Sequence, residues 1–106
     1  DAASATLSEL VRRIERARGP EHALLVRPLG LRGDILRRLR RYDEALPQYD
    51  RAVAIATTQG ARASQGAVLM RRGDLHRRMG NDRAAQDDFE AAAGDGQHQV
   101  VLVLEV

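Results

Sequence analysis

The side chains that most often carry chemistry, histidines and carboxylates, are sparse and irregularly spaced in this chain. The three histidines are His22, His76 and His98. No two of them share the i, i+4 spacing that places two metal ligands on one helix face. The acidic residues Asp87, Asp88 and Glu90 lie close together, and we interpret them as the solvated face of a helix rather than as a metal site. The sequence also lacks a phosphate-binding loop, a nucleophile motif and a glycine fingerprint. We therefore expect no catalytic residue, no metal site and no cofactor, and we expect that the protein is not an enzyme.

Arginine supplies all 17 basic side chains, and lysine is absent. A guanidinium suits bidentate recognition of carboxylates and phosphates, although a bias of the genome toward arginine codons is the simpler reason for a chain without lysine. The position of the charges says more. Residues 1–80 carry 16 arginines against 9 acidic residues, whereas residues 81–106 carry Arg83 against 6 acidic residues. The body of the chain is therefore basic and its end acidic.

Two segments, 31–53 and 71–93, repeat the same pattern at an offset of 40 residues. The identical pairs include Gly33 and Gly73, Asp34 and Asp74, Arg37 and Arg77, Arg38 and Arg78, Ala45 and Ala85, and Ala52 and Ala92. Tyr49 corresponds to Phe89 in the same register. An offset held through helix, turn and helix indicates a duplicated unit.

The apolar residues of each unit follow helical spacing, and the small residues Gly33, Ala45 and Ala52 allow two antiparallel helices to cross closely. We expect Pro28 either to kink the first long helix or to mark a true start near Arg27. Thr6 and Glu9 are expected to form a capping box, and Gly19-Pro20 to end one helix and open the next. The expected helices are 6–18, 21–40, 42–58, 62–79 and 83–93, with a frayed lead-in at 1–5 and a stop at Gly94.

These residues resemble the tetratricopeptide repeat family over about residues 6–93. The resemblance is carried by Gly33 and Gly73, the sequence YDEAL at 42–46, the aromatic residues Tyr49 and Phe89, and Ala52 and Ala92. The sequences GPEH at 19–22 and ALPQY at 45–49, with a long second helix, are most similar to the kinesin light chain variant of that family. The resemblance implies an all-α solenoid of antiparallel helix hairpins with about two and a half repeats, which acts as a protein interaction scaffold.

Two departures from the family pattern fall at equivalent positions. Arg32 and Arg72 stand where the family usually has a large apolar residue, and Leu36 and His76 where it has an aromatic one. Each arginine either packs its methylenes and extends its guanidinium to water or pairs with a carboxylate on a neighbouring helix, such as Asp50 or Glu90. We expect His76 to be partly buried and hydrogen-bonded rather than catalytic.

The segment 95–106 does not continue the repeat pattern. Gly94-Asp95-Gly96 has turn chemistry, and the apolar, β-branched residues that follow favour a strand, with a helix or a disordered segment as alternatives. We divide the chain into a helical repeat domain at 1–94 and a strand-like C-terminal tail at 95–106. The tail is either the start of a downstream segment or an interaction strand.

The predicted binding site is a groove lined by the first helix of each hairpin. Its residues are Arg27, Leu31, Asp34, Arg37, Arg38, Met70, Arg71, Asp74, Arg77 and Arg78. Such a groove is basic, with an apolar floor at Leu31 and Met70, and suits an acidic peptide or partner helix with one or two apolar anchors. Alternatively, the arginines pair only with Asp34 and Asp74 along their own helices.

A second function class is nucleic-acid binding through the arginine-rich face. Asp34 and Asp74 partly neutralise that face, and the aromatic residues Tyr42, Tyr49 and Phe89 belong to the helix-packing stripe. Nucleic acid is therefore the less favoured partner.

The cellular setting can be read only from general features. The longest apolar run, Val100 to Leu104, is too short to cross a membrane. We expect a bacterial, cytoplasmic module of a larger regulatory protein, from which a chain beginning at Asp1 would be a processed piece. Exposed apolar surface at both ends of a short repeat stack predicts a homodimer or dependence on flanking sequence.

Overall fold

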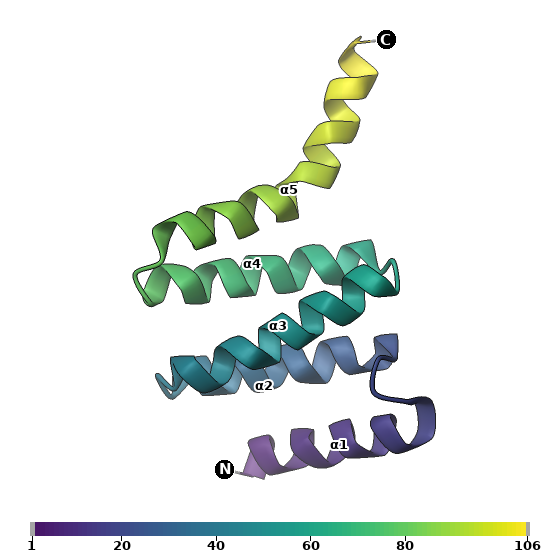
Figure 1. Ribbon diagram of the computed structural model, residues 1–106, viewed down its shortest axis with the longest axis vertical. Coiled ribbons are helices and arrows are strands. Elements are labelled where there is room, and N and C mark those ends of the chain that lie inside the picture. Colours follow the sequence, from purple (N-terminus) through teal and green to yellow (C-terminus); the bar gives the residue numbers. More distant parts are fainter. Residues whose placement is uncertain (1, 106) are drawn as a thin grey trace.

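The computed structural model describes the backbone of residues 2–105 and the side chains of residues 2–94. The elements are α1 (Ala2–Arg18), the short 3-10 helix η1 (Ala23–Leu25), α2 (Val26–Arg38), α3 (Tyr42–Thr58), α4 (Arg62–Arg78) and α5 (Asp82–Glu105). Figure 1 shows the helices stacked along the long axis of the molecule, from α1 at one end to α5 at the other. The all-helical prediction is confirmed for the described backbone.

Left-handed residues end the helices and reverse the chain. Gly19, Gly60 and Gly80 have φ values of 96°, 68° and 84°, a region that glycine enters without steric cost. After α2 the same position is taken by Arg40, with φ 62°, although it corresponds to Gly80 in the second repeat. Arg41 N donates to Leu36 O at 2.8 Å, so the first repeat closes its helix as the others do despite the strained residue.

The start of α2 decides between the two expectations for Pro28. The helix begins at Val26, which puts Pro28 in the first turn, where its missing N–H costs no helical hydrogen bond. Ahead of it, His22 Nδ1 accepts from Leu24 N at 3.1 Å and caps η1. Pro20 therefore lies in a turn, and the prediction that Gly19-Pro20 opens the helix is wrong. The chain first turns through η1, which buries Leu25 completely.

The N-terminal helix is longer than predicted. The expected lead-in at 1–5 is wrong from Ala2 onward, because α1 begins there. Thr6 lies inside the helix, and its hydroxyl donates to Ala2 O at 2.9 Å instead of capping the N-terminus. Glu9 pairs with Arg12 at 3.1 Å, so the expected capping box is not formed.

The last helix also exceeds its predicted bounds. The predicted stop at Gly94 is wrong, since α5 continues to Glu105. A glycine inside a helix costs only about 1 kcal/mol relative to alanine and does not force an end. The strand-like tail at 95–106 is not confirmed, and its side chains lie outside the described residues.

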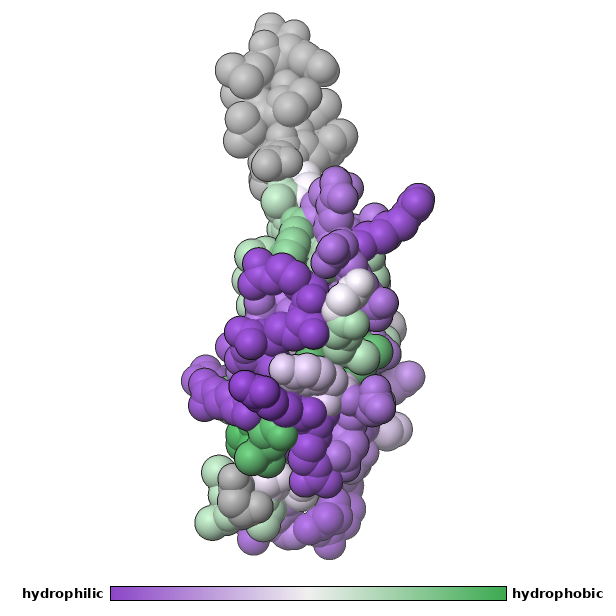
Figure 2. Space-filling model, turned by 90° about the vertical axis from the view of Figure 1, so that its left-hand side faces the viewer, coloured by the Kyte–Doolittle hydropathy of each residue, from purple (hydrophilic) through white to green (hydrophobic). Residues whose placement is uncertain are grey.

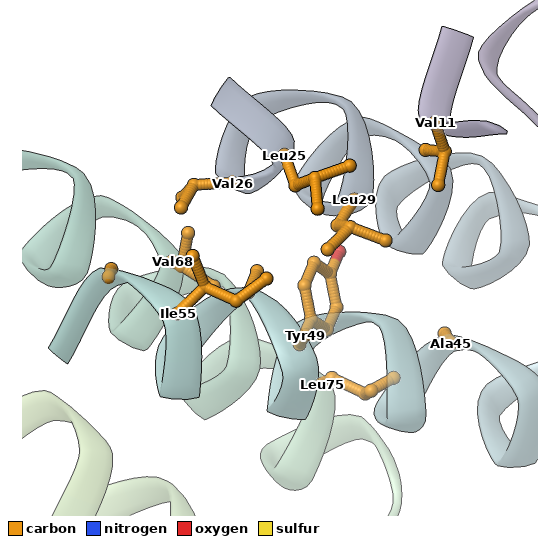
Figure 3. Close-up of a cluster of buried hydrophobic side chains, with 11 residues drawn as sticks. Val11, Leu25, Val26, Leu29, Ala45, Tyr49, Ile55, Val68 and Leu75 are labelled. Atoms are coloured by element: carbon orange, nitrogen blue, oxygen red, sulfur yellow. The ribbon is translucent and has the colours of Figure 1, made fainter. Parts of the chain in front are cut away.

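The core is built by tight crossing of the two helices in each hairpin. Leu25, Leu29, Tyr49 and Leu75 are the largest fully buried side chains, and Figure 3 shows Tyr49 beneath Leu29. A Cβ on Gly33 would lie 2.6 Å from Tyr49 Cε1, and a Cβ on Gly73 would lie 2.6 Å from Phe89 Cε1. The prediction that small residues mark the crossing is confirmed.

We predict that Gly33→Ala destabilises the protein by about 1 to 3 kcal/mol, because the methyl group would overlap the Tyr49 ring. Gly66→Ala is the matched control. Its Cβ would meet only Ala92 O, at 3.8 Å, so this change should stabilise α4 by about 0.5 to 1 kcal/mol. Urea denaturation of both variants tests this, and equal stability changes would show that the crossing is not tight.

Candidate functional site

Two ion pairs connect α2 with α4. Arg71 Nη1 lies 3.5 Å from Asp34 Oδ2, and Arg37 Nη1 donates to Asp74 Oδ2 at 3.2 Å. Each helix contributes one arginine and one aspartate, so the two pairs run in opposite directions. Gly30 leaves room for this approach, since a Cβ there would lie 3.1 Å from Arg71 Nη1.

The core holds Asp34 from behind. The Tyr49 ring is fully buried, and its hydroxyl donates to Asp34 Oδ1 at 2.5 Å. Burial raises the pKa of Tyr49 above its ordinary value, and the neighbouring Asp34 carboxylate raises it further. The phenol therefore stays protonated and fixes one carboxylate of the α2–α4 contact to the crossing of α2 and α3.

Asp74 is the most heavily coordinated carboxylate at this contact. Besides Arg37, it accepts from Arg77 Nη2 at 2.5 Å and from Arg78 Nε at 2.9 Å. The hydrogen bonds from Arg78 and Arg77 lower the pKa of Asp74 below its ordinary value, so it is charged at neutral pH. We call the whole group the arginine–aspartate cluster: Asp34, Arg37, Arg71, Asp74, Arg77 and Arg78. Four guanidinium groups against two carboxylates leave it positive.

The cluster has a half-buried part and an exposed part. The Arg37 side chain is 21% exposed and bridges two helices, whereas Arg77 and Arg78 are 62% and 49% exposed and pair within α4. The expectation that arginines pair only along their own helices thus holds for Arg77 and Arg78 but not for Arg37 or Arg71. Exposed pairs contribute little to stability.

The remaining predicted groove residues do not join this cluster. Arg27 and Arg38 are exposed on α2, and Leu31 is half-buried. Met70 is 51% exposed and lines an open hollow of about 490 Å³ beside the α5 alanines, without Leu31. Leu31 does not line this hollow, so the hollow is not the apolar floor predicted from Leu31 and Met70.

Basic side chains gather where α2 and α4 end. The last turns carry Arg37 and Arg38 in α2, and Arg77 and Arg78 in α4. Cations at these positions are favoured by the partial negative charge of a helix C-terminus. Figure 2 views the molecule from this side, and hydrophilic side chains predominate there. This edge presents charge rather than a broad apolar patch.

Arg72 forms a second ion-pair group, on the other side of α4. Its Nε and Nη2 donate to the two oxygens of Asp88, both at 2.8 Å, and its Nη1 donates to Asp50 at 3.1 Å. Asp88 is only 6% exposed. Of the two alternatives for Arg72, the structure shows pairing with a carboxylate, and Asp50 is one of the partners named, whereas Asp88, the partner with two hydrogen bonds, was not predicted. Asp88 directly precedes Phe89, which packs on Gly73. Its place in the sequence could therefore have identified it as a residue close to the helix crossing and to Arg72.

Two expectations about polar residues near Arg72 are wrong. Asp88 is not part of a solvated face, because it is buried and accepts hydrogen bonds from Arg72. His76 is half-buried as predicted, but its buried Nδ1 has no hydrogen-bond partner among the described residues, and its Nε2 lies 3.8 Å from Asp88. Packing, rather than a hydrogen bond, places the ring.

Within residues 2–94, no three histidine or carboxylate side chains lie close enough to hold a metal ion. In the same part of the chain, no helix has the length and hydropathy needed to cross a bilayer.

Comparison with protein families gives one match. A family model described as Tetratricopeptide repeat matches residues 1–58 and again residues 28–93. No curated protein and no solved structure matches the chain. The two overlapping matches include both hairpins and α1, so they agree with the order of helices in Figure 1.

We predict that Arg72→Met destabilises the protein by about 3 to 5 kcal/mol, because it leaves Asp88 buried and uncompensated. The double variant Arg72→Met/Asp88→Leu should recover most of the loss, since no buried charge remains. Arg32→Met, at the equivalent position of the first repeat, is the control and should cost little. Thermal melts of the three variants test this prediction. If the double variant lost as much stability as the two single substitutions together, Arg72 and Asp88 would not be coupled.

Proposed function

This chain belongs to the tetratricopeptide repeat family, whose members generally mediate protein–protein interaction, and we propose that it binds a protein partner through the arginine–aspartate cluster. The observation that carries this proposal is the net positive charge of a cluster spread over two neighbouring helices. Its partner would be a peptide or helix that presents carboxylates. On this proposal, α2 and α4 line the concave side of the repeat array.

On this proposal, a carboxylate of the partner would replace an existing partner of the cluster arginines rather than bind to unpaired arginines. Arg77 and Arg78 are more than 45% exposed and share one carboxylate, Asp74. An incoming carboxylate therefore finds donors that are already ordered, so less side-chain entropy is lost on binding. Arg27 and Arg38, exposed on α2, extend the positive surface beyond the cluster.

Nucleic-acid binding is the alternative function, and the aromatic residues argue against it. Proteins that bind single strands stack bases on exposed aromatic rings. Here Tyr49 is fully buried, and Tyr42 and Phe89 are half-buried in helix packing. Asp34 and Asp74 also lie among the arginines that would have to contact phosphates.

The proposed setting is a cytoplasmic, bacterial regulatory protein in which residues 1–94 form the interaction module and 95–106 a separate tail. The sequences GPEH and ALPQY support assignment to the kinesin light chain-like variant of the family. The module is proposed to need no cofactor and to have no enzyme activity.

We predict that Arg77→Gln/Arg78→Gln weakens binding of an acidic amphipathic peptide about fivefold, corresponding to about 1 kcal/mol for two exposed pairs. Arg37 is unsuited to this test because it also joins α2 to α4. Fluorescence anisotropy with the acidic peptide, a basic peptide of the same apolar pattern and a single-stranded oligonucleotide gives the measurement.

Arg83→Gln is the matched control, because Arg83 is exposed on α5 outside the cluster. It should leave acidic-peptide binding unchanged. Tighter binding of the oligonucleotide than of the acidic peptide would favour the alternative function. Equal affinity of the double variant and the wild type would refute the role of the cluster.

We also propose that the chain self-associates through its two ends. Leu10 on α1 is 43% exposed, and Met70 beside α5 is 51% exposed at the open hollow. The flanking charges are complementary, since α1 carries four arginines against two glutamates, whereas α5 up to Gly94 carries one arginine against three exposed acidic residues, Asp82, Asp87 and Glu90. The α1 helix of one copy therefore fits the α4–α5 end of another.

We predict concentration-dependent association by light scattering, which Met70→Glu abolishes by placing a charge in the apolar contact. Leu39→Glu is the control, because Leu39 is 52% exposed directly after α2, a helix in the middle of the stack. A monomer at every concentration, or equal loss of association in both variants, would contradict the end-to-end arrangement.

A further inference from the structure

The two repeats can be compared position by position because their helix crossings are nearly identical. A Cβ on Gly33 would lie 2.6 and 2.8 Å from Tyr49 Cε1 and Cδ1, and a Cβ on Gly73 would lie 2.6 and 2.8 Å from the same atoms of Phe89. The two hairpins therefore cross at the same place and with the same spacing. Residues next to these contacts occupy equivalent positions in space.

Arg32 and Arg72 directly precede the two crossing glycines, and Gln48 and Asp88 directly precede the two aromatic rings. Position 48 therefore lies relative to Arg32 as position 88 lies relative to Arg72. In the second repeat, Asp88 accepts two hydrogen bonds from Arg72, at 2.8 Å each. In the first repeat the same place holds an uncharged amide. The guanidinium is present twice, but its carboxylate is present once.

Helix α1 does not supply the missing carboxylate. Glu15 accepts from Arg51 Nη2 at 2.7 Å, which ties α3 to α1. Glu9 pairs with arginines of its own helix, including Arg12 at 3.1 Å. Among the described residues, no carboxylate oxygen lies within 4 Å of Arg32. The acidic side chains of α1 are thus committed elsewhere.

The environment of Arg32 is unfavourable to its charge, whereas that of Arg72 is favourable. Burial lowers the pKa of Arg32 and the positive charge of Arg51 lowers it further, whereas the Glu15 carboxylate opposes this only in part. The hydrogen bonds that Arg72 donates to Asp88 raise the pKa of Arg72. Both guanidinium groups are ionised at neutral pH, so Arg32 is a partly desolvated cation without the hydrogen-bonded carboxylate that Arg72 has.

We infer that Arg32 is a binding site for a carboxylate of an acidic partner protein, which would pair with the Arg32 guanidinium as Asp88 pairs with Arg72. A carboxylate fits because a guanidinium fork and two carboxylate oxygens form parallel, charge-assisted hydrogen bonds, as seen at Arg72. A partly desolvated guanidinium gains more from such a pair than a fully hydrated one does.

This site is separate from the arginine–aspartate cluster. Arg32 precedes Asp34 by two residues, which places the two side chains about 200° apart around α2. Arg32 faces the layer of α1 and α3, as its neighbours Glu15 and Arg51 show, whereas Asp34 faces α4. The inference therefore extends the interaction surface to the opposite side of the helix and does not depend on the cluster being used.

The test replaces the missing carboxylate from within the chain. Gln48→Asp should pair with Arg32 as Asp88 pairs with Arg72, raise the melting temperature by several degrees and occupy the site. Gln48→Asn is the control, since it shortens the side chain equally and adds no charge. The arginine Nε–Hε resonances of the full chain are followed by NMR during titration with a short oligoglutamate peptide and, at matched ionic strength, with inorganic phosphate.

In the wild type and in Gln48→Asn, we expect the peptide to shift the Arg32 resonance saturably, with a much smaller shift from phosphate. In Gln48→Asp the Arg32 shift should be lost. Shifts at Arg77 and Arg78 report the arginine–aspartate cluster separately, so failure at one site is distinguishable from failure at the other. An Arg32 resonance that does not move, or moves equally in Gln48→Asp, would overturn the site. An equal response to phosphate would overturn its assignment to carboxylates.

Discussion

The packing of this protein depends on the close contact between a glycine and an aromatic ring at the point where the two helices of each hairpin cross. With no Cβ on Gly33, the Tyr49 ring lies directly against the α2 backbone, and no larger residue fits without separating the helices. This close approach also lets the Tyr49 hydroxyl reach Asp34 on α2. Asp34 in turn receives Arg71 from α4. The absence of a side chain at Gly33 therefore allows both the packing of α2 on α3 and the ion pair between α2 and α4.

The second repeat keeps the steric part of this arrangement and changes the polar part. Phe89 packs on Gly73 as Tyr49 does on Gly33, but it has no hydroxyl to offer Asp74. Asp74 is instead held by Arg77 and Arg78 of its own helix and by Arg37. A carboxylate held by exposed arginines is easier to release than one held by a buried phenol. The binding edge proposed here therefore belongs mainly to α4.

Much of the architecture follows from local sequence. The helix Tyr42–Thr58 was predicted with its observed bounds, because a turn precedes it and a left-handed glycine follows it. The misplaced boundaries fall where local signals are ambiguous. Gly94 belongs to a Gly-Asp-Gly sequence typical of turns, yet it lies inside α5. The 3-10 helix η1 is too short to show a periodic pattern of apolar residues, so it was not predicted. Glycine permits a helix end without requiring one.

The polar sites were predicted less completely, because a helical wheel gives the direction of a side chain but not what covers it. Asp87, Asp88 and Glu90 look alike in the sequence, yet only Asp88 faces Arg72 and becomes buried. The wheel likewise placed Leu31 and Met70 on one groove, although Met70 lines a hollow against α5 without Leu31. Equivalence between the repeats explains this. Leu31 corresponds to Arg71, which faces α2, and Met70 corresponds to Gly30, which faces α4.

The same equivalence shows that the ion pair of Arg72 and Asp88 in the second repeat has no counterpart at Arg32 and Gln48 in the first. Arg72 can be half-buried because Asp88 and Asp50 surround it, and the family would place an apolar residue there. Replacing a buried pair with apolar residues is often neutral or stabilising, so stability alone does not explain an arginine at this position. Arg32 makes the argument stronger, because it carries the cost of desolvation without either carboxylate. The proposed contact with a partner's carboxylate would supply the ion pair that Arg32 does not make within the described part of the fold.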